Sequence, residues 1–91
     1  LSRDELKRIL TERVLRQYQN EFTLEGISLE VEEAVLDMIV GRSQKMETGA
    51  RGIDAAFIRY LEDAAFETYS RSGVQAVRLF CKGDEVAFEV A

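Results

Sequence analysis

The spacing of the apolar residues constrains this fold more than any other feature of the sequence. Apolar side chains recur at every fourth position in two long stretches, which indicates two helices that each bury one face. The first stripe consists of Leu6, Leu10, Val14, Tyr18 and Phe22, and the second of Ile53, Phe57, Leu61 and Ala65, extended by Phe66 and Tyr69. We therefore expect helices over residues 4–22 and 50–72, the second stopped by Gly73.

A short strand and a further helix are expected between these two helices. Apolar and polar residues alternate over 27–31, which predicts the strand. Glu32 and Glu33 suit the first turn of the helix, where the macrodipole favours anions. That helix is expected to end near Gly41 and to bury Val35, Leu36, Met38 and Ile39. The polar run over 42–48 predicts a loop.

The C-terminal segment changes to a period of two. The alternating apolar positions are Val77, Leu79 and Cys81, followed by Val86, Phe88 and Val90. Residues 82–85, which include Gly83, predict a hairpin connection between these runs. The order of elements predicts an α+β fold with three main helices and a small sheet of two or three strands, including the C-terminal β-hairpin. With 91 residues, the chain is expected to form a single domain, residues 1–91.

The composition excludes several classes of chemistry. The chain has no histidine, which removes His-based triads and His metal sites, and one cysteine, which removes an internal disulfide. The net charge of −5 repels a phosphate backbone, so nucleic acid is not an expected partner. No apolar run approaches the roughly 18 residues of a membrane span, so we expect no membrane contact and a cytoplasmic location. The chain begins with Leu1 instead of Met, which suggests a piece of a longer protein.

The run Thr-Gly-Ala-Arg-Gly-Ile-Asp at residues 48–54 is the most unusual local sequence. It places Arg51 at the start of a helix, although the macrodipole disfavours a cation there. Backbone N–H groups at a helix start and a guanidinium together bind anions such as phosphate, and Gly49 lets a ligand approach the backbone closely. A structural alternative stays open, in which residue 48 or 49 caps the helix and Arg51 pairs with Asp54 or Glu47.

Several features of the chain occur together in one known family. They are the opening Leu-Ser-Arg-Asp-Glu-Leu run with its long helix, the Ile-Ser-Leu strand at 27–29, the helix from Glu32 to Gly41, Gly-Ala-Arg at 49–51 and the closing hairpin. With these features the sequence resembles the C-terminal small subdomain of the second AAA+ module of Clp-type unfoldases, the ClpA, ClpB and ClpV group. The resemblance covers essentially all 91 residues.

The resemblance implies a role for Arg51. In that family the Gly-Ala-Arg arginine is the "sensor 2" residue, which reaches the γ-phosphate of ATP bound mainly by the large subdomain. By resemblance, Arg51 contacts the nucleotide together with Gly49 and Ala50, and ATP is the implied cofactor. The same resemblance implies a hexameric chaperone ring that acts on a protein substrate. In such a ring this subdomain contacts the large AAA+ subdomain of its own and of the adjacent protomer.

The chain lacks the main parts of an ATPase site, and its motif differs from that of ClpA and ClpB. The chain has no G-x-x-x-x-G-K-[ST] phosphate loop and no Walker B carboxylates, so we expect it not to hydrolyse ATP alone, although its parent is expected to be an ATPase. ClpA and ClpB usually continue Gly-Ala-Arg with Pro-Leu, whereas this chain has Gly52, Ile53 and Asp54. This run and the length of the preceding loop are similar to ClpV, the ATPase of type VI secretion.

A second class of function stays open alongside the lid. The chain could be a free-standing α+β module that binds a protein partner through a sheet edge or a helix face. A phosphate loop encoded upstream of Leu1 in the full-length gene would favour the lid, and its absence would favour the module.

The remaining candidate residues are expected to have structural roles. The carboxylates of Asp63, Glu67, Glu30, Glu32 and Glu33 are expected on a solvated surface and not in an acid/base pair. Cys81 is expected to be a buried thiol, because no histidine is present to activate it. Phe57, Phe66 and Tyr69 are expected in the core, except where a lid docks on its neighbours and leaves aromatic side chains exposed in the separate piece.

Overall fold

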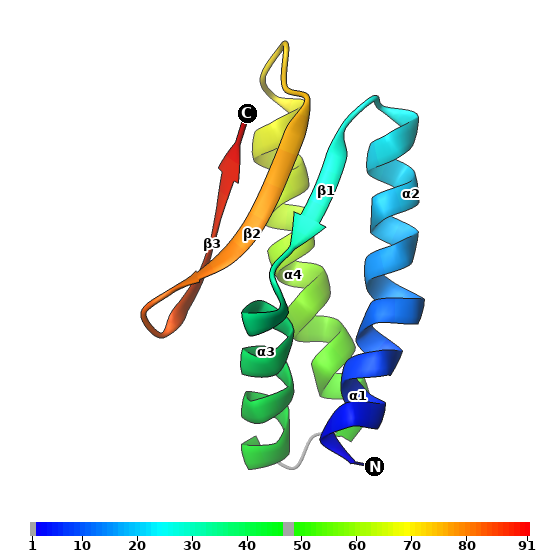
Figure 1. Cartoon of the computed structure of the whole chain (residues 1–91), viewed down its shortest axis with the longest axis vertical. Coiled ribbons are helices and arrows are strands. Elements are labelled where there is room, and N and C mark those ends of the chain that lie inside the picture. The colour runs from blue at the N-terminus through cyan, green and yellow to red at the C-terminus, as the bar shows by residue number, and fades with distance from the viewer. Residues whose placement is uncertain (1, 47–48) are drawn as a thin grey trace.

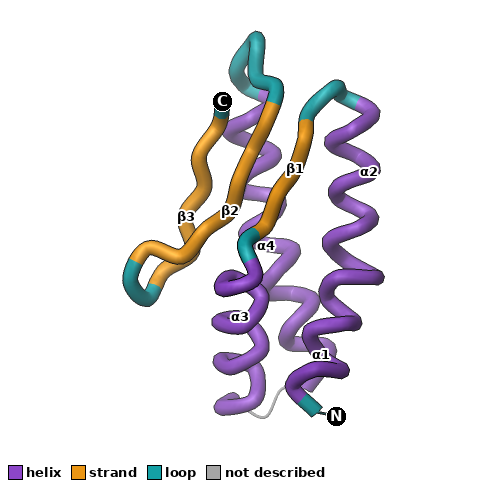
Figure 2. The backbone as a smooth tube through the Cα atoms, in the orientation of Figure 1, coloured by secondary structure: helices purple, strands orange, loops and turns teal. Residues whose placement is uncertain are grey.

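The computed structural model describes residues 2–46 and 49–91, except for the side chains of residues 45, 46 and 49–51. Three helical segments pack against one face and along the edges of a three-stranded sheet, which confirms the predicted α+β class and the C-terminal β-hairpin (Figures 1 and 2). The elements are α1 (Arg3–Ile9), η1 (Leu10–Leu15), α2 (Arg16–Leu24), β1 (Ser28–Val31), α3 (Glu33–Met46), α4 (Gly49–Tyr69), β2 (Ala76–Lys82) and β3 (Glu85–Val90).

The first helix, predicted over 4–22, is confirmed but contains a π-helical segment, η1, between α1 and α2. A constant spacing of four on an α-helix of 3.6 residues per turn rotates the apolar stripe by about 40° at each step. The wider i→i+5 turn of η1 takes up part of this rotation. The buried side chains of the segment are Leu6, Leu10, Val14, Leu15 and Phe22. The π-helical turn therefore keeps one long stripe on the core.

The start of this helix is fixed by a capping box. The hydroxyl of Ser2 accepts a hydrogen bond from the Glu5 backbone N–H at 3.2 Å, and the Glu5 carboxylate accepts one from the Ser2 N–H at 3.1 Å. The hydrogen bond from the Ser2 backbone N–H to the carboxylate is the main cause of the lowered pKa of Glu5, because it favours the charged form.

The prediction of a loop over 42–48 is wrong for residues 42–46, because α3 continues to Met46. Gly41 does not end the helix. It marks a close crossing with α1, where a Cβ atom would lie 3.1 Å from Nη2 of Arg3. Beyond it, Arg42 donates to the Tyr60 hydroxyl at 3.2 Å and to the Asp84 backbone carbonyl, which ties α3 to α4 and to the hairpin. The buried face also shifts, because Val40 is fully buried whereas Met38 is only half-buried.

Helix α4 starts within one residue of the predicted position but ends at Tyr69, three residues before the predicted Ser72. The Ser70 hydroxyl donates to the Glu67 carbonyl at 2.8 Å, and the Arg71 N–H donates to the Thr68 carbonyl at 3.2 Å. These bonds close the last turn before Gly73 is reached, so the glycine lies in the following loop.

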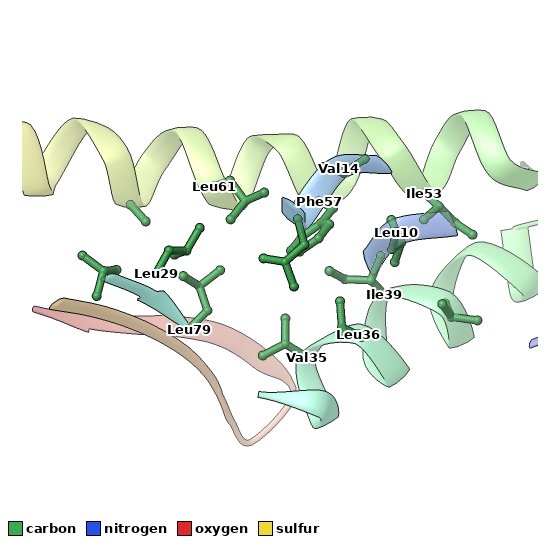
Figure 3. Packing of buried hydrophobic residues seen from close by; sticks show 14 of the residues in the cluster. Leu10, Val14, Leu29, Val35, Leu36, Ile39, Ile53, Phe57, Leu61 and Leu79 are labelled. Atoms are coloured by element: carbon green, nitrogen blue, oxygen red, sulfur yellow. The ribbon is translucent and has the colours of Figure 1, made fainter. Parts of the chain in front are cut away.

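The sheet has the strand order β1-β2-β3, with β1 parallel to β2 and β2 antiparallel to β3. Its inner face carries Leu29, Val77 and Leu79, which are buried against the helices. Figure 3 shows Leu29 and Leu79 facing Leu61 across the space between the sheet and α4. The edge of β1 lies beside α2, where the Gln19 side chain donates to the Leu29 carbonyl at 3.2 Å.

The outer face of the sheet carries a charged cluster centred on Arg78. Its guanidinium pairs with Glu32 and, at 2.7 Å, with Glu89, and lies 4.9 Å from the centre of the Phe80 ring. The Glu89 carboxylate is the main cause of the raised pKa of Arg78. Cys81 is only half-buried, so the predicted thiol is not fully enclosed, but it packs against the hydrophobic core. It lies near the hairpin turn, which extends away from the helices (Figure 1).

Candidate functional site

The run predicted to bind phosphate lies at the start of α4. Gly49, Ala50 and Arg51 are helical and form its first turn, so the predicted position at a helix start is confirmed for the backbone. Their side chains lie outside the described residues, as do Thr48 and Glu47, the alternative cap and ion-pair partner. The phosphate contact of Arg51 therefore stays a prediction.

The residues that follow Arg51 anchor the start of α4 to the first helix. Ile53 is 1% exposed and lies near Leu10 in the core (Figure 3). Asp54 approaches the same helix, since its Oδ2 lies 3.9 Å from Nη2 of Arg13 on η1. Its other oxygen, Oδ1, is buried, and no residue in the described part of the chain donates a hydrogen bond to it. The start of α4 is thus attached to the first helix by the apolar contact of Ile53 and the weak ion pair of Asp54.

A second feature is a set of three exposed large hydrophobic side chains near the C-terminal ends of α2 and α4. They are Leu24, Phe66 and Tyr69, which are 86%, 78% and 50% exposed. The prediction that Phe66 extends the buried stripe is wrong. It follows the fully buried Phe57 by nine residues, or two and a half helical turns, and so lies on the opposite face of α4. The sequence pattern does not identify Leu24, because this residue lies outside the repeat of four that runs from Leu6 to Phe22.

Acidic side chains lie close to Tyr69. Partial burial is the main cause of the raised pKa of Tyr69, and the charges of Glu25 and Glu21 raise it further. Burial also raises the pKa of Tyr18, with contributions from Glu62 and Glu21. The tilted ring of Tyr69 packs on Phe22 at 5.4 Å between ring centres. The side of the molecule formed by α2 and α4 therefore combines aromatic groups with negative charge.

The other candidate carboxylates are mostly engaged in ion pairs. Glu32 pairs with Arg78, Glu33 with Lys7 at 2.6 Å, and Glu67 with Arg71 at 3.2 Å. Within residues 2–46 and 49–91, no group of three or more metal-binding side chains is placed to hold a metal ion. In the same residues, no helix has both the length and the apolar character that a membrane crossing requires.

Comparison with known proteins shows that this chain is similar to part of the Clp proteins. The family described as the C-terminal, D2-small domain, of ClpB protein matches residues 1–78. The ATP-dependent Clp protease ATP-binding subunit ClpX of Bacteroides thetaiotaomicron is 35% identical over 75 residues, which cover 79% of this chain and 18% of that protein. The subunit ClpX 3 of Methylococcus capsulatus is 38% identical over 71 residues, which cover 75% of this chain and 16% of that protein. The chain spans less than a fifth of the length of these relatives.

Proposed function

The chain belongs to the C-terminal small domains of the Clp-type AAA+ ATPases, and from this we propose that it is the lid of an ATP-driven ring, in which Arg51 contacts the phosphates of ATP. The observation that carries the proposal is the family match over residues 1–78, a stretch that contains Gly-Ala-Arg in the first turn of α4. The same match favours the lid over a free-standing interaction module.

The chemistry of the proposed contact follows from the position of the motif. The first turn of a helix offers unpaired backbone N–H groups and a partial positive charge, and both favour phosphate. A guanidinium adds a planar fork of donors that matches two phosphate oxygens. The phosphate loop and the Walker B carboxylates, absent from these 91 residues, belong to the remainder of the parent. Closing the lid over ATP bound there would complete the site.

The chain by itself is expected to bind ATP no more tightly than a Kd of about 1 mM, or roughly −4 kcal/mol. Arg51 is the single side chain assigned to phosphate here, and one charge-assisted contact cannot replace a phosphate loop. Isothermal titration calorimetry of the 91-residue chain with ATP measures this directly. Micromolar binding would contradict a lid that depends on the rest of its parent.

We further propose that the exposed Leu24, Phe66 and Tyr69 are covered by a large AAA+ subdomain in the assembled parent. These side chains make the largest exposed apolar contribution among the described residues, and apolar exposure of this kind marks contact surfaces. The chain spans less than a fifth of its relatives, so most of the surface available to cover them lies elsewhere in the parent.

Phe66→Ser in the full-length parent is expected to raise the subunit concentration at half-assembly by about 10- to 150-fold. The expected effect is that of removing one buried Phe side chain, about 1.5–3 kcal/mol. Analytical ultracentrifugation in the presence of ATP measures the shift. Ala55→Ser, at an exposed position on the same helix, is the matched control and should leave assembly unchanged. Equal assembly of the Phe66→Ser variant and the wild type would show that this surface stays open in the ring.

The proposal also covers the branch of the Clp family to which the parent belongs. The residues Gly52–Asp54 after Gly-Ala-Arg are similar to those of ClpV, the type VI secretion ATPase, whereas the relatives reported above are named ClpX. We propose the type VI secretion branch on that run alone. Two phosphate loops upstream of this chain in the full-length gene would support it, because the chain would then close a second AAA+ module. A single loop would contradict it.

A further inference from the structure

The C-terminal ends of α2 and α4 lie at the same end of the molecule (Figure 1), and a groove of about 440 Å³ is formed there. The wall of the groove includes Glu25, directly after α2, and Tyr69, the last residue of α4. Leu24 precedes Glu25 in the chain, and Phe66 lies one turn before Tyr69, so two further exposed hydrophobic residues are close to those of the groove. A volume of this order accommodates the side chains of a short peptide segment. The groove and the exposed residues beside it are therefore suited to contact with another protein surface.

The groove lies at the negative ends of two helices. The macrodipole gives the C-terminus of each helix a partial negative charge, which a basic residue in the last turn commonly offsets. Neither α2 nor α4 has a basic residue in its last turn. Helix α2 instead carries Glu21 in its last turn and Glu25 as its C-cap. The sequence thus adds negative charge where helix electrostatics favours positive charge.

The charge of these two carboxylates is not neutralised within the part of the chain that the structure describes. Glu21 and Glu25 are exposed, and no cation among the described residues pairs with either of them. Arg71, the basic residue in the wall of the groove, pairs with Glu67 at 3.2 Å. Burial raises the pKa of Tyr69, and the charges of Glu25 and Glu21 raise it further, so both carboxylates act on the Tyr69 side of the groove. A tyrosine ring also attracts a cation that lies over its face.

We propose that the groove receives a lysine or arginine side chain from the large AAA+ subdomain that covers Leu24, Phe66 and Tyr69. The charged end of that side chain pairs with Glu25 and Glu21, and its aliphatic stem lies on the ring of Tyr69. This proposal rests on the proposed contact of the lid with a large subdomain, to which it adds the charge of the covering surface. Because Tyr69 belongs both to that contact and to the wall of the groove, the same subdomain covers the two.

Neutralising both carboxylates in the full-length parent tests this proposal, with analytical ultracentrifugation in the presence of ATP as the measurement. We expect Glu21→Gln/Glu25→Gln to raise the subunit concentration at half-assembly by about 2- to 30-fold, the effect of losing two exposed ion pairs. Raising the ionic strength should weaken assembly of the wild type more than assembly of this variant, because salt screens the ion pairs that only the wild type forms. Glu30→Gln/Glu85→Gln makes the same change in net charge at exposed positions outside the groove, and should match the wild type in both measurements.

The outcomes separate the cation in the groove from the contact of the lid as a whole. Wild-type assembly or unchanged salt sensitivity of Glu21→Gln/Glu25→Gln, together with a defect in Phe66→Ser, would overturn the cation and leave the apolar contact intact. Wild-type assembly of both variants would overturn the contact itself. An equal defect in Glu30→Gln/Glu85→Gln would show a general effect of charge and would also overturn the proposal.

Thermal melting separates a lost contact from lost folding. Glu21→Gln/Glu25→Gln should melt at or above the wild-type temperature, because a carboxylate near a helix C-terminus opposes the macrodipole. If the double variant melted at a lower temperature, the single variant Glu25→Gln would decide the question. Its expected increase in the concentration at half-assembly is about 1.4- to 5-fold.

Discussion

Arg51→Ala in the full-length parent is expected to lower ATP turnover by about 10- to 150-fold while leaving this domain folded. The functional loss corresponds to one charge-assisted contact to phosphate, typically about 1.5–3 kcal/mol. The folding expectation follows from the backbone position of Arg51 in the first turn of α4. A cation near a helix N-terminus opposes the macrodipole, so its removal should not destabilise the helix. Steady-state hydrolysis and circular-dichroism melting measure the two halves of this expectation.

Two controls make the Arg51 experiment specific. Arg51→Lys should restore only part of the turnover, because an ammonium keeps the charge but loses the planar fork. Arg59→Ala removes an exposed arginine two turns further along the same helix and should have little effect. Arg42 is a poorer control than its closeness in sequence suggests, since it donates to Tyr60 and to the hairpin. Wild-type hydrolysis by Arg51→Ala would reduce Arg51 to an ordinary surface residue.

The helices and strands could be predicted from periodicity where burial follows a single repeat. The stripes of the first helix and of α4, and the alternation in β2 and β3, place these elements within a few residues. The end of α3 could not be predicted, because residues 42–46 are polar and their helix is supported by contacts to distant segments. The hydrogen bonds from Arg42 to Tyr60 and Asp84 are such contacts, and they cannot be inferred from the composition of the local segment.

The candidate site also has one part that could be predicted from the sequence and one part that could not. The Gly-Ala-Arg motif and its position at a helix start are local properties, and both can be read in the sequence. The burial of Asp54 Oδ1, with no donor among the described residues, depends on how η1 packs against α4, which no local pattern encodes. The π-helical turn that carries Arg13 could not be predicted either. A spacing of four alone does not distinguish a regular α-helix, whose apolar stripe rotates around the helix, from a helix with a wider turn.

Phe57→Ala is expected to lower the free energy of unfolding of the 91-residue chain by about 3–5 kcal/mol. Phe57 is fully buried, and Figure 3 shows it between α4, the first helix and α3, close to Val14. Because α4, the first helix and α3 all meet at this ring, the cavity left behind cannot be closed by the movement of one neighbour. A domain of this length has a total stability of roughly 5–14 kcal/mol, so this loss would remove a large part of it, and nearly all of it at the lower end of that range.

The chain supplies its own matched control for this prediction. Phe66→Ala makes the same chemical change on the same helix, at a side chain that is 78% exposed, and should alter stability by no more than about 0.5 kcal/mol. Thermal melting of the two variants should therefore differ by about 10 °C or more. Similar melting temperatures would contradict the placement of Phe57 in the core. A large difference, together with an assembly defect for Phe66→Ser in the parent, would show that two phenylalanines on one helix have separate tasks. One would stabilise the lid, and the other would hold it against its neighbour.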